Sequence, residues 1–404
     1  MTELTSKSNE KEKIIKTEGY WIYNEKGERF LDITCGGFAF PLGYANKEIA
    51  EAIYNSLMTV TRCQSPLGYT TDDIEDMSRF LMHSGEWSGY SWAVTGTGAV
   101  ECALATSDVY WKQHGKRHKR KTIAFGNGWH GTSDVTKKLS GLFPVYENDR
   151  VSIVNSPVWK NTDERHDEEK RAIQSVRKLL ETSQDYGSII INPHPWFNGV
   201  NPWSHWFWNK IKDIKNEFDI LLITDDVAAC WGKGKAYHSH MTMMPDGVKG
   251  DISCLGKAIT GGYAPLAAIV TNNKVTRAVR GKLSYGHTYQ PLVSGTAAMR
   301  AVRDIMERDK LLDNSHIIEN KLIELGNKFK ETGLVNSFRV FGLSAAYDID
   351  KHVDRDRMGA KGRYYGKSGE SAASPVMRVC APLIADDEYF YSLEKLMKEM
   401  LESG

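Results

Sequence analysis

Short apolar runs alternate with amphipathic stretches through the middle of the chain. Such runs are typical of buried parallel strands, and the stretches between them are typical of helices that cover both faces of a sheet. The predicted strands are residues 91–94, 121–125, 188–191, 220–224, 252–255 and 266–271, and the clearest helices are residues 98–111 and 168–181. The pattern therefore predicts an α/β domain with a mostly parallel central sheet.

The two chain ends follow a different pattern. Residues 48–60 place Ile49, Ile53 and Leu57 on one helical face with Asn46 available as the N-cap, and residues 386–402 repeat this spacing. Residues 334–349 are predicted strands outside the alternating core. We therefore expect a smaller α+β domain made from residues 1–60 and 301–404, beside a large domain at residues 61–300. Residues 352–374, rich in glycine, serine and charge, are expected to form a mobile loop.

Length and charge limit the classes of partner. A chain of 404 residues is long enough for two domains. Its 52 basic side chains nearly cancel 51 acidic ones, so a net charge of +1 gives no reason to expect nucleic acid or an anionic membrane. We interpret the basic run at residues 116–121 as a solvated loop. No apolar run approaches the roughly 18 residues of a membrane span, and residues 1–16 are polar, so we expect a cytoplasmic protein without a membrane partner.

The cysteines and histidines give no sign of a disulfide or a metal site. The six cysteines lie in apolar stretches without paired spacing, as expected of buried thiols in a reducing compartment. They are Cys35, Cys63, Cys102, Cys230, Cys254 and Cys380. The close pair His238 and His240 has no cysteine or carboxylate at ligand spacing, so we interpret both as surface histidines and expect no metal.

The strongest chemical signal is a carboxylate and a lysine that each follow an apolar strand. Asp225 ends the run LLITD, at the carboxyl edge of the sheet where open α/β folds bind ligands. Lys257 follows the run ISCLG and precedes a Gly-Gly turn. Burial there favours a neutral, nucleophilic amine, and a carboxylate beneath a pyridine ring would keep the ring nitrogen protonated. Taken alone, Asp225 is equally well a strand-end cap and Lys257 a snorkelling side chain.

Two glycine-containing turns are candidates for cofactor contacts. Gly96, Thr97 and Gly98 lie between a strand and a helix, where backbone N–H groups can bind phosphate. Residues 126–131, GNGWHG, formally match the dinucleotide fingerprint. Because Gly141 and a proline interrupt the next stretch early, we favour instead a loop that presents Trp129 and His130 to a flat ring.

The segments TGTGAVECA, GNGWHG, ITDDVAACWGKGKAY, LGKAITGG and GHTY occur in the order and at the intervals typical of one family. Over about residues 18 to 400 the chain resembles the class III aminotransferases of PLP fold type I. The resemblance implies pyridoxal 5'-phosphate as cofactor and transfer of an amino group from an amine or amino acid to a keto or aldehyde acceptor by a ping-pong mechanism. Some segments look closest to the diaminopelargonate (7,8-diaminononanoate) synthases.

The resemblance assigns roles around the cofactor ring. Trp129, in the same loop as His130, matches the aromatic residue that stacks on the ring, and Val227 matches the apolar residue on its other face. Asp225 matches the partner of the ring nitrogen. Lys257 matches the lysine that holds the cofactor as a Schiff base.

The phosphate contacts implied by the resemblance come from two chains. Gly96 and Thr97 match the phosphate-binding turn. Thr288, within GHTY, matches the residue that reaches the phosphate bound by the neighbouring subunit. The resemblance therefore implies a homodimer with composite active sites.

Several positions depart from the family pattern. Gly98, Asn192 and Asp226 stand where glutamates are usual, and Asn192 has the greater consequence because that glutamate helps many members to accept two kinds of substrate. Residues 35–38, which end in Phe38, stand where the diaminopelargonate enzymes carry paired tryptophans. The substrate pocket of those enzymes is therefore not reproduced.

Two further features concern the substrate. Arg378, within VMRVCAPLI, matches an arginine that many class III members use for a substrate carboxylate, with a structural ion pair as the alternative. Four tryptophans cluster near a predicted helix start, and core packing is the favoured interpretation. They are Trp196, Trp203, Trp206 and Trp208.

Other functions on the same scaffold stay open at this point. A PLP-dependent aminomutase or decarboxylase would use the same residues, because these hold the cofactor and do not select the bond that is broken. A pseudoenzyme is supported only by the three replaced glutamates, and the presence of both Asp225 and Lys257 argues against it.

Overall fold

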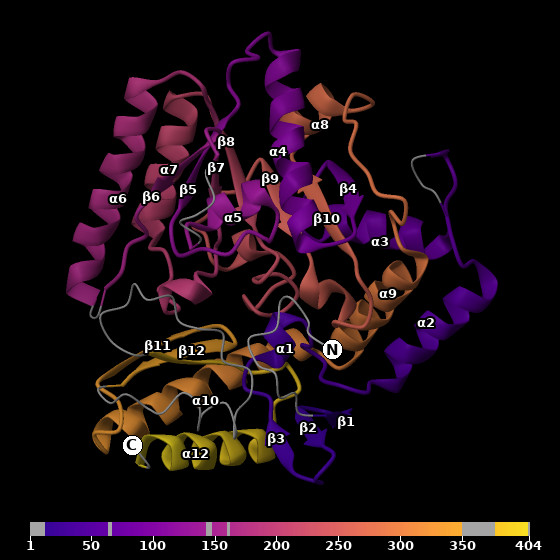
Figure 1. The fold of residues 1–404 in the computed structure, drawn as a ribbon, viewed down its shortest axis with the longest axis vertical. Coiled ribbons are helices and arrows are strands. Elements are labelled where there is room, and N and C mark those ends of the chain that lie inside the picture. The colour runs from indigo at the N-terminus through magenta and orange to yellow at the C-terminus, as the bar shows by residue number, and fades with distance from the viewer. Residues whose placement is uncertain (1–12, 64–66, 143–147, 160–161, 350–375, 403–404) are drawn as a thin grey trace.

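The computed structural model describes residues 13–63, 67–142, 148–159, 162–349 and 376–402. The loop expected at residues 352–374 lies outside this range. Figure 1 shows a large sheet with helices packed around it and a smaller group of strands and helices beneath it.

The large sheet has seven strands in the order β4-β10-β9-β8-β7-β5-β6. They are β4 (Gly89–Ala93), β5 (Lys121–Phe125), β6 (Val151–Val154), β7 (Tyr186–Ile191), β8 (Leu221–Asp225), β9 (Ile252–Leu255) and β10 (Ala267–Thr271). Strands β5 to β9 pair in parallel, whereas β10 is antiparallel to both neighbours. The α/β class and all six predicted strands are confirmed, and β6 is a strand that the sequence pattern did not predict.

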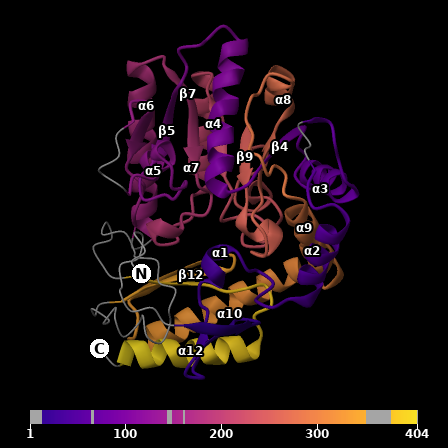
Figure 2. The same ribbon diagram turned by 45° about the vertical axis from the view of Figure 1, so that its right-hand side comes forward.

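Helices cover both faces of this sheet (Figures 1 and 2). One face packs against α4 (Gly96–Gln113) and α8 (Asn273–Val279), and the other against α6 (Thr162–Thr182) and α7 (His205–Glu217). In β7, Ile190 belongs to the apolar cluster that contains side chains of α4 and α8. Ile189 and Ile191 belong to the cluster that contains side chains of α6 and α7. Each such side chain contributes about 1.5–3 kcal/mol when it is buried. Burial on both faces explains why the strands are continuous apolar runs rather than alternating ones.

The two chain ends meet beneath the large sheet. A three-stranded sheet comprises β1 (Ile14–Glu18), β2 (Trp21–Asn24) and β3 (Arg29–Leu31), and another comprises β11 (Ser337–Phe341), β12 (Ser344–Asp348) and β13 (Val376–Cys380). Beside them lie α10 (Leu311–Glu331) and α12 (Asp387–Glu402), as both views show. The Tyr20 hydroxyl donates to Asp386 over 2.6 Å, which ties the first strands to the start of α12.

Three helices lie beside the large sheet, namely α2 (Lys47–Thr59), α3 (Asp72–His83) and α9 (Val293–Arg308). The predicted N-cap of α2 is confirmed, because the Asn46 side chain accepts from the Ile49 N–H over 3.2 Å. Ile49 is fully buried, whereas Leu57, which was predicted on the same helical face, is 41% exposed.

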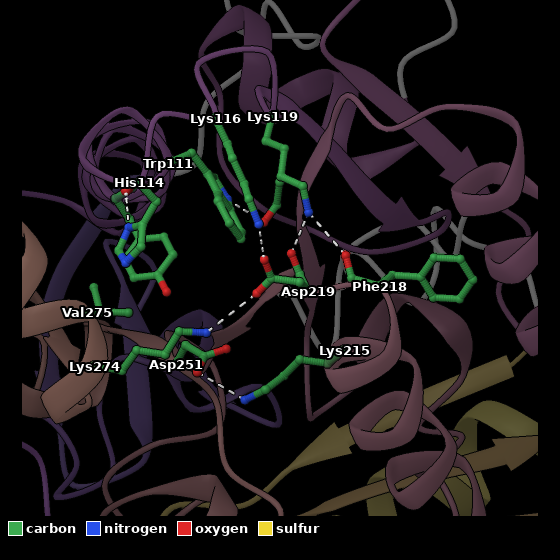
Figure 3. Close-up of polar contacts among 12 residues, drawn as sticks. Trp111, His114, Lys116, Lys119, Lys215, Phe218, Asp219, Asp251, Lys274 and Val275 are labelled. Carbon is green, nitrogen blue, oxygen red and sulfur yellow. Dashed lines mark hydrogen bonds and ion pairs between the residues drawn. The ribbon is translucent and has the colours of Figure 1, made fainter.

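The basic run at residues 116–121 is only partly solvated. Figure 3 shows Lys116 and Lys119 pointing toward the turn that precedes β8. Lys119 is buried and donates to the carbonyls of Phe218 and Asp219, while Lys116 pairs with the Asp219 carboxylate over 2.6 Å. For Lys119 the predicted solvated position is therefore wrong. Its ammonium holds the loop after α4 against the loop after α7.

The cysteine prediction is confirmed, since all six are buried free thiols. The surface interpretation of His238 is wrong: it is fully buried beside η3 (Ser239–Met241) and bonded to Ser84 and Trp87. Within the described part of the chain, no group of three or more His, Cys, Asp or Glu residues is arranged to hold a metal. Among the same residues no helix is long and apolar enough to cross a membrane.

Candidate active site

The carboxyl ends of β8 and β9 open into a cavity of about 170 Å³. Asp225 is the last residue of β8, and Lys257 follows β9 at the start of a short 3-10 helix, η4 (Lys257–Thr260). Nine of the eleven predicted site residues line this cavity. They are Phe38, Gly96, Thr97, Trp129, His130, Asn192, Asp225, Val227 and Lys257.

Asp225 is held in one orientation by two donors. The His130 ring nitrogen Nδ1 lies 2.7 Å from Asp225 Oδ2, and the Val227 N–H donates to Oδ1 over 3.2 Å. Both Asp225 and His130 are almost fully buried. A buried carboxylate with fixed partners can in turn fix the protonation state of a basic ring nitrogen that approaches it.

Lys257 has the properties of a nucleophilic amine. Burial lowers the pKa of its side chain; the Asp225 carboxylate opposes this effect, and the positive charge of Lys233 adds to it. Its backbone lies in the left-handed region at φ 48°. A residue that is not glycine is strained there, and such strain occurs at functional sites.

The N-terminus of α4 also lines the cavity. Thr95 caps this helix by accepting from the Gly98 N–H over 3.0 Å, and Gly96 and Thr97 form its first turn. A Cβ atom at Gly96 would lie 2.8 Å from Val227 Cγ1, so glycine is required for the close approach of the two segments. The N-terminus of a helix of this length favours a phosphate group.

The dinucleotide interpretation of residues 126–131 finds no support in the geometry. The helix that follows, α5 (Asp134–Ser140), is short and ends at Gly141 with φ 63°. The loop instead brings Trp129 into the cavity and His130 against Asp225. This agrees with the alternative that the sequence favoured.

Phe38 enters the cavity from a left-handed turn. Backbone hydrogen bonds with helical spacing run through α1 (Cys35–Phe38), but all of its φ angles are positive, from 53° at Cys35 to 74° at Phe38. The Phe38 ring packs edge-on against Trp196, with centroids 4.6 Å apart. The Nζ atoms of Lys233 and Lys257 lie 5.5 and 5.1 Å from its centroid, so both lysines contact this ring.

Lys233 is a second buried lysine that the sequence did not single out. It is fully buried, and its Nζ donates to the Cys380 sulfur over 3.3 Å. Burial alone would lower the pKa of Lys233, but the charges and hydrogen bonds of Cys35 and Cys380 raise it. Burial likewise opposes ionisation of Cys380, yet the Cys35 thiol and the Lys233 charge together hold the pKa of Cys380 below its ordinary value. Both pKa directions favour an ammonium paired with a thiolate.

The remaining wall is aromatic and was mostly missed from the sequence. Residues 194–197 line it, including His194 and the beginning of η2 (Trp196–Asn198). Phe197 stacks on Trp129 with centroids 5.4 Å apart. The packing interpretation of the tryptophans is confirmed for Trp203 and Trp208, which belong to the core beside α6 and α7, but Trp196 lines the cavity. Residues 192–196, NPHPW, directly follow β7 at the carboxyl edge of the sheet, where open α/β folds bind ligands. This position was the sequence signal from which their place in the cavity wall could have been predicted.

Two predicted site residues lie outside the cavity. Arg378 is buried, donates to the Trp196 carbonyl over 2.7 Å and lies 5.1 Å from the Trp196 ring. In this conformation it supports the wall from behind. Thr288 is exposed, and its carbonyl accepts from Arg62 over 3.3 Å.

The three replaced glutamates have local explanations. A Cβ at Gly98 would meet the Tyr285 hydroxyl at 3.2 Å, so a glutamate here would require Tyr285 to shift. Asp226 is buried, and burial raises its pKa to about 6 although the Ser239 hydrogen bonds oppose this. The Asn192 side chain accepts from the His194 N–H over 2.9 Å. It therefore fixes the turn of the cavity wall, where a glutamate would place a negative charge.

Known proteins share parts of this sequence and its fold. The family model described as aminotransferase class-III matches residues 5–401. The acetylornithine aminotransferase of Aquifex aeolicus is 27% identical over 397 residues, covering 96% of this chain and 96% of the relative. The adenosylmethionine-8-amino-7-oxononanoate aminotransferase of Geobacter sulfurreducens is 25% identical over 371 residues, covering 83% of this chain and 78% of the relative. The structure of an amine transaminase from an uncultivated Pseudomonas species, in the PLP-bound form, superposes with a TM-score of 0.86 at 21% identity, covering 100% of this chain and 97% of that one.

Proposed function

Since the chain belongs to the class III aminotransferases, which depend on pyridoxal 5'-phosphate, we propose that the cavity at the ends of β8 and β9 is its active site. The observation that carries the proposal is that Asp225, supported by His130, and the amine of Lys257 line one cavity. There the protein would move an amino group from an amine or amino-acid donor to a keto or aldehyde acceptor in two half-reactions.

The residues present fit the cofactor. The first turn of α4 at Gly96 and Thr97 would hold its phosphate, and Trp129 and Val227 would contact its ring. Asp225 would face the ring nitrogen and keep it protonated. When bound, the cofactor supplies an electron sink that stabilises negative charge on the substrate carbon.

The protein groups orient the substrate and move a proton. Lys257 Nζ, whose pKa is lowered by burial, can attack a carbonyl carbon in its neutral form and afterwards carry a proton as a general base. Lys233, which also contacts the Phe38 ring, favours the neutral form of Lys257 through its charge. The aromatic wall of Phe38 and Trp196 limits the access of water to this amine.

The test is chemical trapping. Protein saturated with pyridoxal 5'-phosphate should absorb visible light, and borohydride should then attach the cofactor to the peptide that contains Lys257. Lys257→Ala should lose the label, whereas Lys233→Met, which removes the other buried lysine, should keep it. Labelling at Lys233, or at no lysine, would contradict the assignment.

A donor amine distinguishes the reactions that the scaffold can support. An aminotransferase transfers the amino group to the cofactor in a half-reaction and therefore loses the visible band without release of carbon dioxide. A decarboxylase releases carbon dioxide, a mutase returns an isomer of its substrate, and a pseudoenzyme leaves the spectrum unchanged.

We also propose that two copies form a dimer with composite sites. Supporting it is a group of exposed large apolar side chains around Thr288 and the end of α2. They are Tyr54, Leu57, Met58, Val60, Leu67, Tyr69 and Tyr289. Monomeric proteins seldom expose this much apolar surface.

Mixed dimers test this arrangement. If Thr288 completes the site of the partner, a dimer of one Lys257→Ala chain and one Thr288→Ala chain has one intact site and one site with both lesions. About half of the wild-type cofactor sites should then survive per dimer. If Thr288 serves its own chain, every site carries a lesion and none should survive.

A further inference from the structure

His194 is a buried polar side chain in the cavity wall that has no hydrogen-bond partner among the described residues. Its ring lies among aromatic rings, 6.0 Å from Phe38 and Phe341 and 6.5 Å from Trp196 between centroids. It is fully buried and lines the cavity, and neither ring nitrogen is paired within the part of the chain that the structure describes. Buried polar groups in native proteins are nearly always paired, so an unpaired imidazole at a ligand cavity indicates a partner supplied by the ligand.

The backbone holds this imidazole in place. Asn192 Oδ1 accepts from the His194 N–H over 2.9 Å, and the His194 carbonyl accepts from the Trp196 N–H over 2.8 Å. Pro193 and Pro195 flank the residue and fix the neighbouring φ angles. The turn therefore has little freedom to swing the ring away from the wall.

The charge around His194 limits what it can bind. Burial and the positive charges of Lys233 and Lys257 lower the pKa of His194 to about 4, so the ring is neutral at pH 7 and one of its nitrogens carries a proton to donate. The same positive charges disfavour a second ammonium group. Of the described residues that line the cavity, only Lys257 is a lysine or arginine, so a carboxylate would find no dedicated cation there.

We propose that His194 is a specificity-determining residue that donates a hydrogen bond to an uncharged oxygen acceptor of the substrate, such as a hydroxyl or carbonyl, beyond the reacting carbon. The substrate class is then an amino compound with an apolar body, which packs on Phe38 and Trp196, and a neutral oxygen group. This inference rests on the proposed function, and it names the substrate class of the same site.

The experiment compares primary amines of equal length that end in a methyl, a hydroxyl or an ammonium group. Half-reaction kcat/KM values should rank the hydroxyl amine first and the diamine last. His194→Phe keeps an aromatic ring but removes both nitrogens, so it should reduce the hydroxyl-to-methyl ratio about tenfold, through KM rather than kcat. His194→Gln, which retains a donor, should restore part of that ratio.

Several outcomes would overturn the inference. Equal losses for the hydroxyl and methyl amines in His194→Phe would give the residue a structural role only. A wild-type enzyme that does not prefer the hydroxyl amine to the methyl amine would also refute the inference. Since that comparison needs no variant, the inference can be tested even if His194→Phe folds poorly.

Failure of the proposed function would look different. In that case borohydride would not label Lys257, whatever the amine. Fluorescence of the cavity residues Trp129 and Trp196, followed during titration with the same amines, would then still report whether His194→Phe changes the hydroxyl-to-methyl ratio of Kd. An unchanged ratio would reject the inference independently of turnover.

Discussion

The buried pair of Lys233 and Cys380 gives the sharpest prediction about stability. Lys233 is fully buried, and its ammonium is 3.3 Å from the Cys380 sulfur. Cys380→Ala removes the thiolate and leaves a buried ammonium beside the Cys35 thiol alone. Loss of one partner of a buried ion pair costs about 3–5 kcal/mol of unfolding free energy, because the other charge is left unpaired.

Removal of both charges should cost much less. In the double variant Lys233→Met with Cys380→Ala, no buried charge remains, and apolar replacement of a buried pair is often neutral. The double-mutant cycle should therefore give a coupling energy of at least about 2 kcal/mol. Cys102→Ala is the matched control, since Cys102 is an equally buried thiol whose pKa is raised by burial.

The pH dependence follows from the direction of the pKa shift. The folded protein holds the pKa of Cys380 below its unfolded value, so the thiolate contributes stability that is fully present above the ordinary thiol pKa, near 8.5, and is lost as the pH falls through the lowered value. The cost of Cys380→Ala should therefore grow between about pH 6 and pH 8.5. The raised pKa of Cys102 keeps that thiol neutral in the folded protein over this range, so the cost of Cys102→Ala should not grow with pH.

The assay is urea unfolding of the wild type, the two single variants, the double variant and the control at several pH values between about 6 and 8.5. The comparison is valid when all variants have equal m-values, since a change in m would mean that a variant alters the unfolded state. A coupling energy near zero, or a Cys380→Ala cost that is independent of pH, would show that the two side chains are a neutral amine and a neutral thiol.

Three further predictions concern single positions. Gly96→Ala should lower cofactor retention at least tenfold in an equilibrium dialysis measurement, because its Cβ would lie 2.8 Å from Val227 Cγ1, and adding Val227→Ala should recover part of the loss. Lys119→Met should destabilise the protein by about 1.5–3 kcal/mol through two lost charge-assisted bonds, whereas the exposed Arg117→Met should change the unfolding free energy by less than about 0.5 kcal/mol. Arg378→Lys should lower the half-reaction rate equally for donors with and without a carboxylate, since Arg378 supports the cavity wall from behind. A selective loss for carboxylate donors would show instead that Arg378 binds the substrate carboxylate.

The places of the proposed cofactor-binding residues were determined largely by local sequence. Asp225 and Lys257 each follow an apolar strand, and the parallel sheet brings the ends of such strands to one edge. Gly96 lies between a strand and a helix for the same reason. Because periodicity and turn chemistry act over a few residues, they can be read without knowing which distant segments meet.

Tertiary structure decided the partners of these groups. His130 meets Asp225 across 95 positions, and Lys233 meets Cys380 across 147, and no local pattern encodes either contact. The burial of Lys119 was mispredicted for the same reason, and the exposure of Leu57 could not be predicted, since each depends on the element that packs on it. Local sequence fixes which face of an element is apolar, whereas the packing of distant elements decides which side chains lose water and which charges then compensate one another.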